Sequence, residues 1–297
     1  MMVSHPLLAG KLLKNEPMTR YNSWRVGGIA EQVYLPAGLQ DLSVFLLSAD
    51  CIKPIYFIGL GSNLLVLDGG VTGTVVVMHN ALNAVELQAD CIYAEAGVTC
   101  AKLAKFAAAN NKEGAEFFAG IPGTVGGALA MNAGCYGTET WDMVARVMTI
   151  DVYGVTHVRE KADFVTSYRH VEFAYPNEWF VGAWFALPQG DGKASAQKIK
   201  ELLAKRLASQ PLNLPNAGST FRNPTNDFAA RLVEAVGLKG KQIGGAQISS
   251  KHANFIVNLG DATAQNILDL IHLMQHTVKA QFGVDLQQEV KVIGVKA

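Results

Sequence analysis

The alternation of apolar and polar residues predicts short strands over the first two thirds of the chain. The apolar runs are rich in β-branched and aromatic residues and end at Gly, Asp or Asn, which is typical of strands bounded by turns. We expect strands at residues 55–58, 64–67, 74–78, 92–94, 144–152 and 179–187. Helical segments lie between them, so the pattern indicates a mixed α and β protein.

Apolar residues also recur at helical spacing. Residues 39–49 form one such segment, and Thr99 can cap a second helix that continues to Asn110, with Leu103, Phe106 and Ala107 on one face. Further helices are expected at 194–208, 227–236 and 263–282, and a strand at 290–295.

Two of these helices carry start and stop signals. Asn226 is a candidate cap and Gly237 a stop for the helix at 227–236. The helix at 263–282 starts at Asp261 or Thr263, ends at Gly283, and carries one apolar stripe. The stripe comprises Ile267, Ile271, Met274, Val278 and Phe282.

A turn-rich segment at residues 188–193 is the expected domain boundary. We therefore predict a first domain at 1–190, in lobes of roughly 1–75 and 76–190, and a second at 191–297. The final strand is also able to pack back on the N-terminal part, in which case the chain crosses this boundary more than once.

Composition narrows the class of protein. The 297 residues are 49% hydrophobic and 17% charged, which excludes a disordered chain, a coiled coil and a collagen-like fibre. The formal net charge is zero, which disfavours a nucleic-acid-binding protein. Acidic residues are in excess before residue 191 and basic residues after it. The basic part suits either an anionic small ligand or an ordinary solvated surface.

The sequence favours a cytoplasmic protein. No apolar run reaches the roughly 18 residues that a membrane helix needs, and residues 1–15 lack the order of a signal peptide. The four cysteines are scattered without Cys-x-x-Cys spacing, which indicates reduced thiols. The seven histidines show no metal-ligand spacing, so we expect no metal site.

Two glycine-rich loops suggest a bound nucleotide. Gly59-Leu-Gly-Ser-Asn63 begins like a dinucleotide fingerprint, but Leu64 replaces the third glycine and a strand follows in place of a helix. Such a loop still presents several backbone N–H groups to a pyrophosphate, or it is an ordinary turn.

The second loop strengthens this interpretation. Six glycines fall within residues 120–137, which lets a large ligand lie close to the backbone. Thr124 can cap a short helix whose N-terminus faces phosphate oxygens. A tightly packed core segment is the competing interpretation. Together the two loops favour a flavin or nucleotide bound outside the Rossmann and Walker contexts.

Eight ordered motifs resemble one known family, that of UDP-N-acetylenolpyruvoylglucosamine reductase. The resemblance covers nearly the whole chain, from about Asn22 to Gly294. The motifs are Asn22-Ser-Trp-Arg-Val-Gly-Gly28, Gly59-Leu-Gly-Ser-Asn-Leu-Leu65, Ala119-Gly-Ile-Pro-Gly-Thr-Val-Gly-Gly-Ala128, Met131-Asn-Ala-Gly134, Tyr168-Arg169, Pro215-Asn-Ala-Gly-Ser-Thr-Phe-Arg-Asn-Pro224, His252-Ala-Asn-Phe-Ile-Val-Asn258 and Gln288-Glu-Val290.

The resemblance implies an α+β fold with two parts. The first is a two-lobed FAD-binding domain of the vanillyl-alcohol-oxidase type, and the second is a smaller α+β domain that binds a UDP-sugar. The chain resembles the shorter type of the family, because an inserted loop that carries a substrate-contacting tyrosine is missing after Tyr168-Arg169.

The implied activity is the reduction of UDP-N-acetylglucosamine enolpyruvate to UDP-N-acetylmuramate in peptidoglycan precursor synthesis. NADPH is the co-substrate and FAD is bound noncovalently. The residues that the resemblance places at FAD are Gly59, Gly61, Ser62, Asn63, Gly120, Pro122, Gly123, Thr124, Gly126 and Gly127.

Three residues are implied to be catalytic. Hydride addition to an enolpyruvyl ether develops negative charge on the substrate carboxylate and requires one proton. Arg169 matches the carboxylate with its planar fork, Ser219 is the implied proton donor, and Glu289 is implied to stabilise the enolate. From the residue types alone, other interpretations stay open. Arg169 is also consistent with a surface arginine, Ser219 with a turn serine, and Glu289 with an acidic residue at the start of a strand. Gln287 stands where the family usually has a second glutamate.

Substrate-binding candidates complete the picture. Tyr168, Arg222 and Asn223 are expected to contact the UDP-sugar, although Asn223 also suits a turn before Pro224. Arg206 is a further cation near the phosphates.

Two other functions stay open at this point: a flavin-dependent sugar or alcohol oxidase on the same fold, and a nucleotide-sugar-binding protein without catalysis. The expected partner is the small-molecule substrate, with no nucleic acid and no membrane. A monomer is the default, because the sequence does not indicate an oligomeric state.

Overall fold

The computed structural model describes residues 8–297. The first seven residues, part of the segment considered for a signal peptide, lie outside the described residues. Two compact units are present, and both are discontinuous in sequence. The first comprises residues up to Lys14, Gln32–Gly59 and Gly73–Leu202, and the second comprises Asn15–Glu31, Leu60–Thr72 and Leu203–Ala297.

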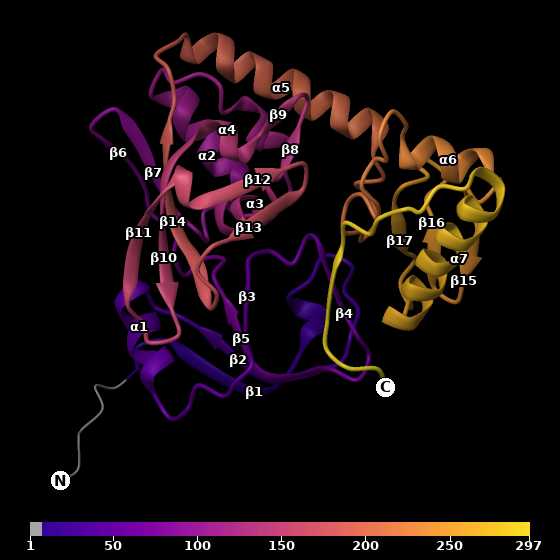
Figure 1. Cartoon of the computed structure of the whole chain (residues 1–297), viewed down its shortest axis with the longest axis horizontal. Coiled ribbons are helices and arrows are strands. Elements are labelled where there is room, and N and C mark those ends of the chain that lie inside the picture. The colour runs from indigo at the N-terminus through magenta and orange to yellow at the C-terminus, as the bar shows by residue number, and fades with distance from the viewer. Residues whose placement is uncertain (1–7) are drawn as a thin grey trace. The chain divides into compact units, whose positions relative to one another are not determined.

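An antiparallel five-stranded sheet forms the centre of the first unit (Figure 1). Its order is β11 (Thr156–Glu160), β10 (Val144–Asp151), β14 (Glu178–Ala186), β7 (Cys91–Glu95) and β6 (Val85–Gln88). The register is interrupted by bulges in the β10–β14 pair. The strand expected at 179–187 thus becomes the middle strand of the sheet, with its residues 181–185 buried.

Short helices cover one face of this sheet. They are α2 (Cys100–Ala109), η2 (Glu116–Gly120), α3 (Val125–Met131) and α4 (Thr140–Met143). The predicted cap of α2 is confirmed, because the Thr99 hydroxyl accepts a hydrogen bond from the Lys102 amide at 3.2 Å. Leu103 and Ala107 face the buried core, whereas Phe106 is only partly buried. This core also includes the fully buried Phe118 and Phe185.

A second sheet has the order β1 (Lys11–Pro17), β2 (Ile29–Leu35), β5 (Val71–Val77) and β3 (Ile55–Ile58). β3 and β5 pair in parallel, with Phe57 opposite Val76. The helix α1 (Leu39–Leu47) buries Leu42, Phe45 and Leu46 in a cluster with Tyr34 and other apolar residues of the first unit.

The remaining elements of the first unit are small. A hairpin joins β12 (Phe164–Ser167) to β13 (His170–Phe173), and residues 174–177 alone separate β13 from β14. This short connection agrees with the expected absence of an inserted loop. The others are β8 (Gly134–Cys135), β9 (Thr138–Glu139) and η3 (Lys161–Asp163).

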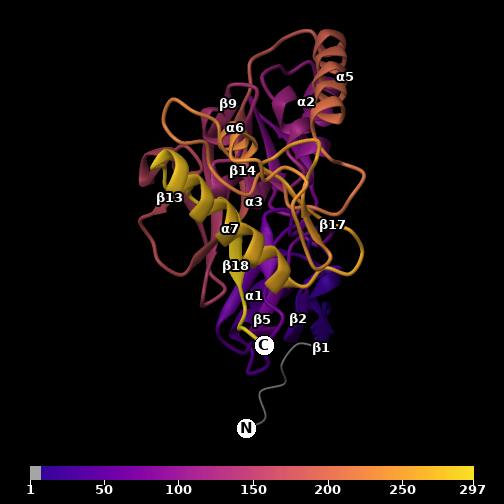
Figure 2. The ribbon, with the colours of Figure 1, turned by 90° about the vertical axis from the view of Figure 1, so that its right-hand side faces the viewer.

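Helices and a small sheet build the second unit. It contains η1 (Met18–Arg20), α6 (Ala229–Ala235), α7 (Ala264–Phe282) and the sheet β15 (Gln242–Ile243), β16 (Ala246–Ile248) and β17 (Ile256–Asn258). Helix α7 contacts β15 and β16, and its full length is visible in Figure 2. Its buried stripe includes Ile267, Ile271, Met274 and Val278, but Phe282 is 39% exposed and does not continue it.

The final strand pairs with a segment from far earlier in the chain. β18 (Lys291–Ile293) runs parallel to β4 (Leu64–Val66), with Val292 opposite Leu65. The expected return of the final strand to the N-terminal part is therefore observed. The pairing explains why residues 60–72 belong to the second unit.

Two predicted features differ from the structure. Helix α6 begins at Ala229 instead of 227, and the Asn223 side chain, not Asn226, accepts a hydrogen bond from the Ala229 amide. Asn226 instead has a left-handed backbone conformation with φ of +61°. The boundary expected at 190 lies two residues before α5 (Gly192–Ser209), whereas the first compact unit continues into this helix as far as Leu202.

Helix α5 is held to the first unit near its start. The buried Glu116 carboxylate accepts hydrogen bonds from the Ser195 hydroxyl at 2.7 Å and from Lys198 at 3.4 Å. Burial by itself would raise the pKa of Glu116, but these donors and the Gly114 amide outweigh it and lower the pKa. No helix among the described residues has the length and apolar character needed to cross a membrane.

Candidate functional site

The two glycine loops meet within the first unit. Gly59 directly follows β3, and Thr124 directly precedes α3. A Cβ added to Gly59 would lie 2.2 Å from the Thr124 hydroxyl oxygen, so only glycine fits at this crossing. A β-bridge between Thr99 and Thr124 fixes the second loop from the other side. The Thr124 side chain therefore packs directly against the backbone of Gly59.

Thr124 is the N-cap residue of α3, as predicted, but its side chain makes no capping hydrogen bond. The Val125 amide donates a hydrogen bond to the Val98 carbonyl at 2.8 Å, and the Gly126 amide donates one to the Ala96 carbonyl at 2.9 Å. A Cβ on Gly126 would lie 2.9 Å from the Ala96 side chain. This loop is therefore anchored to the sheet by its own backbone.

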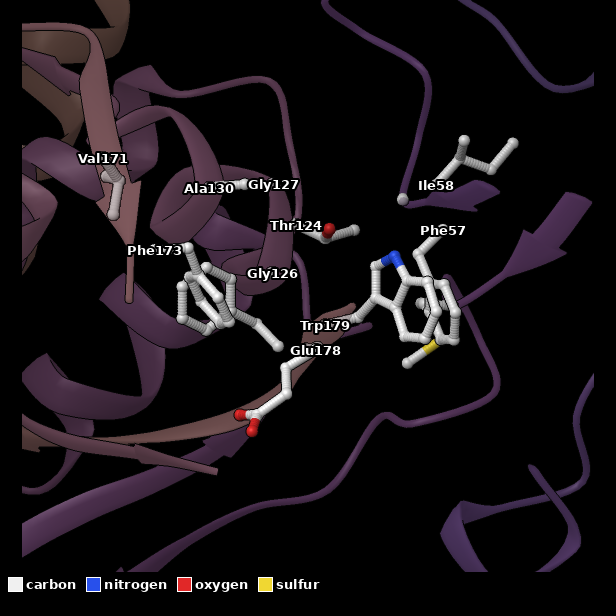
Figure 3. Close-up of a pocket in the computed structure, with 14 residues that line it drawn as sticks. Phe57, Ile58, Thr124, Gly126, Gly127, Ala130, Val171, Phe173, Glu178 and Trp179 are labelled. Atoms are coloured by element: carbon white, nitrogen blue, oxygen red, sulfur yellow. The ribbon is translucent and has the colours of Figure 1, made fainter. Parts of the chain in front are cut away.

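A pocket of about 250 Å³ opens beside this crossing (Figure 3). Of the predicted cofactor-binding residues, Gly59, Thr124, Gly126 and Gly127 line it. The rest of the lining is mainly apolar and comes from β3, β13 and β14, from α3, and from the residues directly after β5 and β7. These other residues are Phe57, Ile58, Met78, Ala96, Ala130, Val171, Phe173, Glu178, Trp179 and Phe180.

Aromatic side chains form one wall of the pocket. Phe57 of β3 and Trp179 of β14 are stacked, with ring centroids 4.5 Å apart and planes inclined by 19°. Figure 3 shows the Trp179 indole against Phe57, on the side of the pocket that faces Thr124. Apolar surface, aromatic faces and closely approaching glycine backbone suit a planar heterocycle joined to phosphate. The residues present therefore fit the predicted FAD.

Glu178 is held as an anion at the edge of the pocket. Its carboxylate accepts hydrogen bonds from the Arg159 guanidinium and from the Thr149 hydroxyl, the latter at 2.6 Å. Burial by itself would raise the pKa of Glu178, but the Arg159 and Thr149 hydrogen bonds outweigh it and lower the pKa. Glu178 thus anchors β14 beside Trp179 and is not suited to donate a proton.

Six predicted cofactor residues do not line this pocket. Gly61, Ser62 and Asn63 belong to the second unit. Gly61 has φ of +63°, and a Cβ there would lie 2.1 Å from the Tyr21 carbonyl oxygen. The Asn63 amide donates to the Glu289 carbonyl at 3.1 Å. The others are Gly120, Pro122 and Gly123.

Arg169 occupies the two-residue turn between β12 and β13, with φ of +56°. Its guanidinium donates to the Gly134 carbonyl at 2.5 Å and to the Asn132 carbonyl at 3.4 Å. Glu139 lies 3.9 Å away, and the Tyr168 ring centroid lies 4.9 Å from the Arg169 Cζ. The strain of a left-handed arginine is thus offset by several defined contacts.

Ser219 and Glu289 lie on two paired segments of the second unit. The Glu289 amide donates to the Thr220 carbonyl at 2.9 Å, and the Arg222 amide donates to the Gln287 carbonyl at 2.9 Å. Ser219 is half-buried and follows Gly218, whose φ is +74°. Segments more than 60 residues apart in sequence are therefore neighbours in the second unit.

The other substrate-binding candidates differ in surroundings. Asn223 is exposed, and its side-chain oxygen is used by α6. The Arg222 Nε atom is buried and has no hydrogen-bond partner within the described residues. Tyr168 is 45% exposed beside Arg169. Among residues 8–297, no group of three His, Cys, Asp or Glu side chains is arranged to hold a metal.

Sequence reasoning missed the aromatic wall and the support of Arg169. Phe57 and Trp179 were visible only as strand residues, and Phe173 lay in no predicted element. Their shared pocket depends on β3, β13 and β14 coming together. Asn132 was noticed only within a motif. Its left-handed φ of +42° at the end of α3 is typical of asparagine, but its long-range contacts have no local signal.

Comparisons with known proteins identify relatives over nearly the whole chain. A family model described as "FAD binding domain" matches residues 31–158, and one described as "UDP-N-acetylenolpyruvoylglucosamine reductase, C-terminal domain" matches residues 210–293. A Nitrosospira multiformis protein named UDP-N-acetylenolpyruvoylglucosamine reductase is 54% identical, covering 97% of this chain and 90% of its own. A protein of the same name from Methylococcus capsulatus is 52% identical, covering 96% of this chain and 94% of its own.

A solved structure is also similar. It is the crystal structure of UDP-N-acetylenolpyruvylglucosamine reductase from Thermus caldophilus, with a TM-score of 0.82 and 29% sequence identity. The match covers 96% of this chain and 99% of that one. The likeness therefore extends over both compact units.

Proposed function

This chain belongs to the UDP-N-acetylenolpyruvoylglucosamine reductase family, and from that membership we propose how its own residues carry out the reaction. The α+β class with an FAD-binding domain is confirmed. So is the predicted activity, FAD-mediated and NADPH-dependent reduction of UDP-N-acetylglucosamine enolpyruvate. The oxidase alternative receives no support.

The chemistry sets two tasks for the protein. Bound FAD would supply the redox chemistry, by which hydride from NADPH would reach the methylene carbon of the enolpyruvyl ether. Negative charge then develops on the neighbouring carbon and on the carboxylate attached to it. The protein must bind that carboxylate and deliver one proton to the neighbouring carbon.

We assign the FAD site to the pocket of the first unit. The glycines at the loop crossing, Gly59, Gly126 and Gly127, let the backbone approach the cofactor closely, and Thr124 places a hydroxyl there. Trp179 provides an aromatic face for a planar ring of FAD. The predicted contacts of Gly61, Ser62, Asn63, Gly120, Pro122 and Gly123 remain proposals that the pocket itself does not support.

Arg169 is the proposed partner of the substrate carboxylate. A guanidinium forms two parallel, charge-assisted hydrogen bonds to a carboxylate, and such bonds strengthen as charge develops in the transition state. The contacts to the carbonyl groups of residues 132 and 134 hold the side chain in a defined direction. This supports a role that a freely moving surface arginine would not fill.

Ser219 is the proposed proton donor, and Glu289 the proposed stabiliser of the enolate. The observation that carries the proposal is the pairing of their segments, through the Glu289 amide and the Thr220 carbonyl. A serine hydroxyl is a weak acid, so it donates only to a strongly basic carbon held in place. An adjacent carboxylic acid stabilises the same charge when it is protonated.

Arg222 and Asn223 of the second unit, and Tyr168 of the first, are each proposed to contact the UDP-sugar. The buried Arg222 Nε atom, which lacks a hydrogen-bond partner within the described residues, is a suitable donor to a phosphate oxygen. Because the Asn223 oxygen is engaged by α6, only its amide nitrogen is proposed for the ligand. Since UDP-sugars and NADPH are cytoplasmic metabolites, we place the reaction in the cytoplasm.

Anaerobic half-reactions test this assignment. The flavin is first reduced with NADPH, and its reoxidation by UDP-N-acetylglucosamine enolpyruvate is followed by absorbance. Ser219→Ala is expected to slow reoxidation about 10²- to 10⁴-fold, as for loss of a general acid. Arg169→Lys is expected to slow it about 10- to 100-fold through the lost charge-assisted hydrogen bonds. Reduction by NADPH should be unchanged in both variants.

Ser209→Ala is the matched control, because Ser209 is exposed on α5 and bonds only to helix carbonyls. Its two half-reactions should equal those of the unmodified protein. Rapid reoxidation of both Arg169→Lys and Ser219→Ala would remove these residues from the mechanism, although the family membership would stand.

A further inference from the structure

The support of Arg169 converges on one buried side chain, that of Asn132. Asn132 is 2% exposed and ends α3 with a left-handed backbone, φ of +42° and ψ of +51°. Its carbonyl is one of the acceptors for the Arg169 guanidinium. A buried, polar side chain that lies two residues before a motif glycine and bonds to a charged turn needs an explanation.

The Asn132 amide makes three hydrogen bonds at once. Its Nδ2 donates to Glu139 Oε2 at 2.7 Å and to the Ser167 carbonyl at 3.1 Å, while its Oδ1 accepts from the Trp141 amide at 3.1 Å. Ser167 is the last residue of β12, immediately before the Tyr168-Arg169 turn. The side chain therefore ties the base of the turn to the end of α3.

The same amide restrains the acidic neighbour of Arg169. Glu139 Oε1 lies 3.9 Å from Arg169 Nη1, well beyond hydrogen-bond length, while the other oxygen is held by Asn132. Glu139 also accepts from the amide of Asp142 in the capping box of α4. A carboxylate fixed in this way aligns the guanidinium but does not close a bidentate pair with it.

We propose that Asn132 is a positioning residue for the reaction: it fixes the turn at Ser167 and keeps Glu139 beyond hydrogen-bond length from Arg169, so that the guanidinium stays directed at a substrate carboxylate. The inference rests on the proposed role of Arg169. It adds a residue that touches neither substrate nor cofactor in this assignment. Misplacement of a binding group by about 1 Å is enough to cost up to about 100-fold in rate.

The isosteric substitution Asn132→Asp tests the proposal. Aspartate tolerates the left-handed backbone but cannot donate to Ser167 or Glu139, and it brings a second carboxylate next to Glu139. We expect kcat/KM for UDP-N-acetylglucosamine enolpyruvate to fall about 10- to 100-fold, mainly through KM. The rate of flavin reduction by NADPH should stay within about twofold.

A donor–acceptor exchange makes the test specific. In the double variant Asn132→Asp/Glu139→Gln, the new amide at position 139 can donate to the new carboxylate at position 132. We expect part of the lost kcat/KM to return, although the bond to Ser167 stays missing. This variant also removes the adjacent pair of carboxylates, and so provides a second measurement if Asn132→Asp alone does not fold.

Asn15→Asp is the control. Asn15 also has a left-handed backbone, with φ of +53°, but it is exposed on β1. The same chemical change there should leave both half-reactions unaltered. A general effect of the asparagine-to-aspartate change would appear in both variants, and an effect through Arg169 only at position 132.

The outcomes separate this inference from the proposed function. If Arg169→Lys does not slow reoxidation, the role of Arg169 fails and the inference with it. If Arg169→Lys slows reoxidation but Asn132→Asp does not, only the inference is overturned. It is also overturned if Asn132→Asp slows both half-reactions equally, or if the double variant recovers nothing.

Discussion

At the scale of single residues, the side chains that shape the candidate FAD site are strand residues with no motif of their own. Trp179 and Phe57 lie far apart in sequence but stack across the pocket. Glu178 and Arg159 fix the start of β14 beside them. The glycines supply room, while these neighbours supply the surface that a planar ring can contact.

Replacing Trp179 should weaken cofactor binding. Loss of one aromatic contact is worth about 0.5–1.5 kcal/mol, so Trp179→Leu is expected to raise the FAD dissociation constant about 3- to 10-fold. Titration of the apoprotein with FAD, followed by the change in flavin fluorescence, measures this. The control is Trp184→Leu, because Trp184 lies in the same strand but does not line the pocket. Equal affinities for the two variants would contradict the assigned site.

Residue types alone did not separate ligand contacts from structural ones. Asn223 is predicted to bind substrate, and its side-chain oxygen also accepts a hydrogen bond from the Ala229 amide, at the start of α6. Gly61 was predicted to bind FAD, yet its close neighbour is the backbone at Tyr21. Asparagine and glycine serve both purposes with the same local sequence, because turns and ligand loops need the same conformational freedom.

At the scale of elements, helix ends in the second unit depend on both local and distant residues. The Thr263 hydroxyl caps α7 by accepting a hydrogen bond from the Asn266 amide at 3.1 Å. Thr263 is one of the two starts that the sequence predicts, and Gly283 ends the helix with φ of +69°. The carboxylate of Asp68 also accepts from the amides of Ala264 and Gln265, both at 2.9 Å. Asp68 is therefore a second cap, supplied from almost 200 residues earlier.

Removing this distant cap should destabilise the second unit. Asp68→Ala is expected to lower the free energy of unfolding by about 1 kcal/mol, with an upper limit near 2. Hydrogen exchange at the Ala264 and Gln265 amides should accelerate. Asp261→Ala is the control, because Asp261 is the other start that the sequence suggests and lies outside the cap. A larger effect at Asp261 would show that the local signal, not Asp68, starts the helix.

At the scale of the whole molecule, each compact unit is assembled from separate stretches of chain. The core of the second unit combines Trp24, Val26 and Leu65 with residues of α6 and α7. The Trp24 indole donates to the Ile256 carbonyl at 2.7 Å, and Asn258 donates to the Trp24 carbonyl at 2.8 Å. The C-terminal third therefore lacks part of its own core.

A fragment of residues 203–297 is accordingly expected not to fold alone. Without Trp24 it loses a fully buried aromatic side chain, worth about 3–5 kcal/mol when truncated in a core, and β18 loses its partner strand β4. Such a loss is a large part of the stability of a small domain. Thermal unfolding by circular dichroism measures this, with the full chain as the reference. A cooperative transition of the isolated fragment would contradict the expectation.

The sequence by itself determined the mixed α and β class, the longer helices, the strands β3, β4, β5, β7, β10, β14 and β18, the cap at Thr99, and the family. These features depend on periodicity, on capping residues, and on motifs that are legible along the chain. The tertiary structure decided the discontinuous units, the aromatic pocket around Trp179, the cap at Asp68 and the support of Arg169 by Asn132. Each of these joins residues far apart in sequence, and such contacts arise only when packing brings separate segments together.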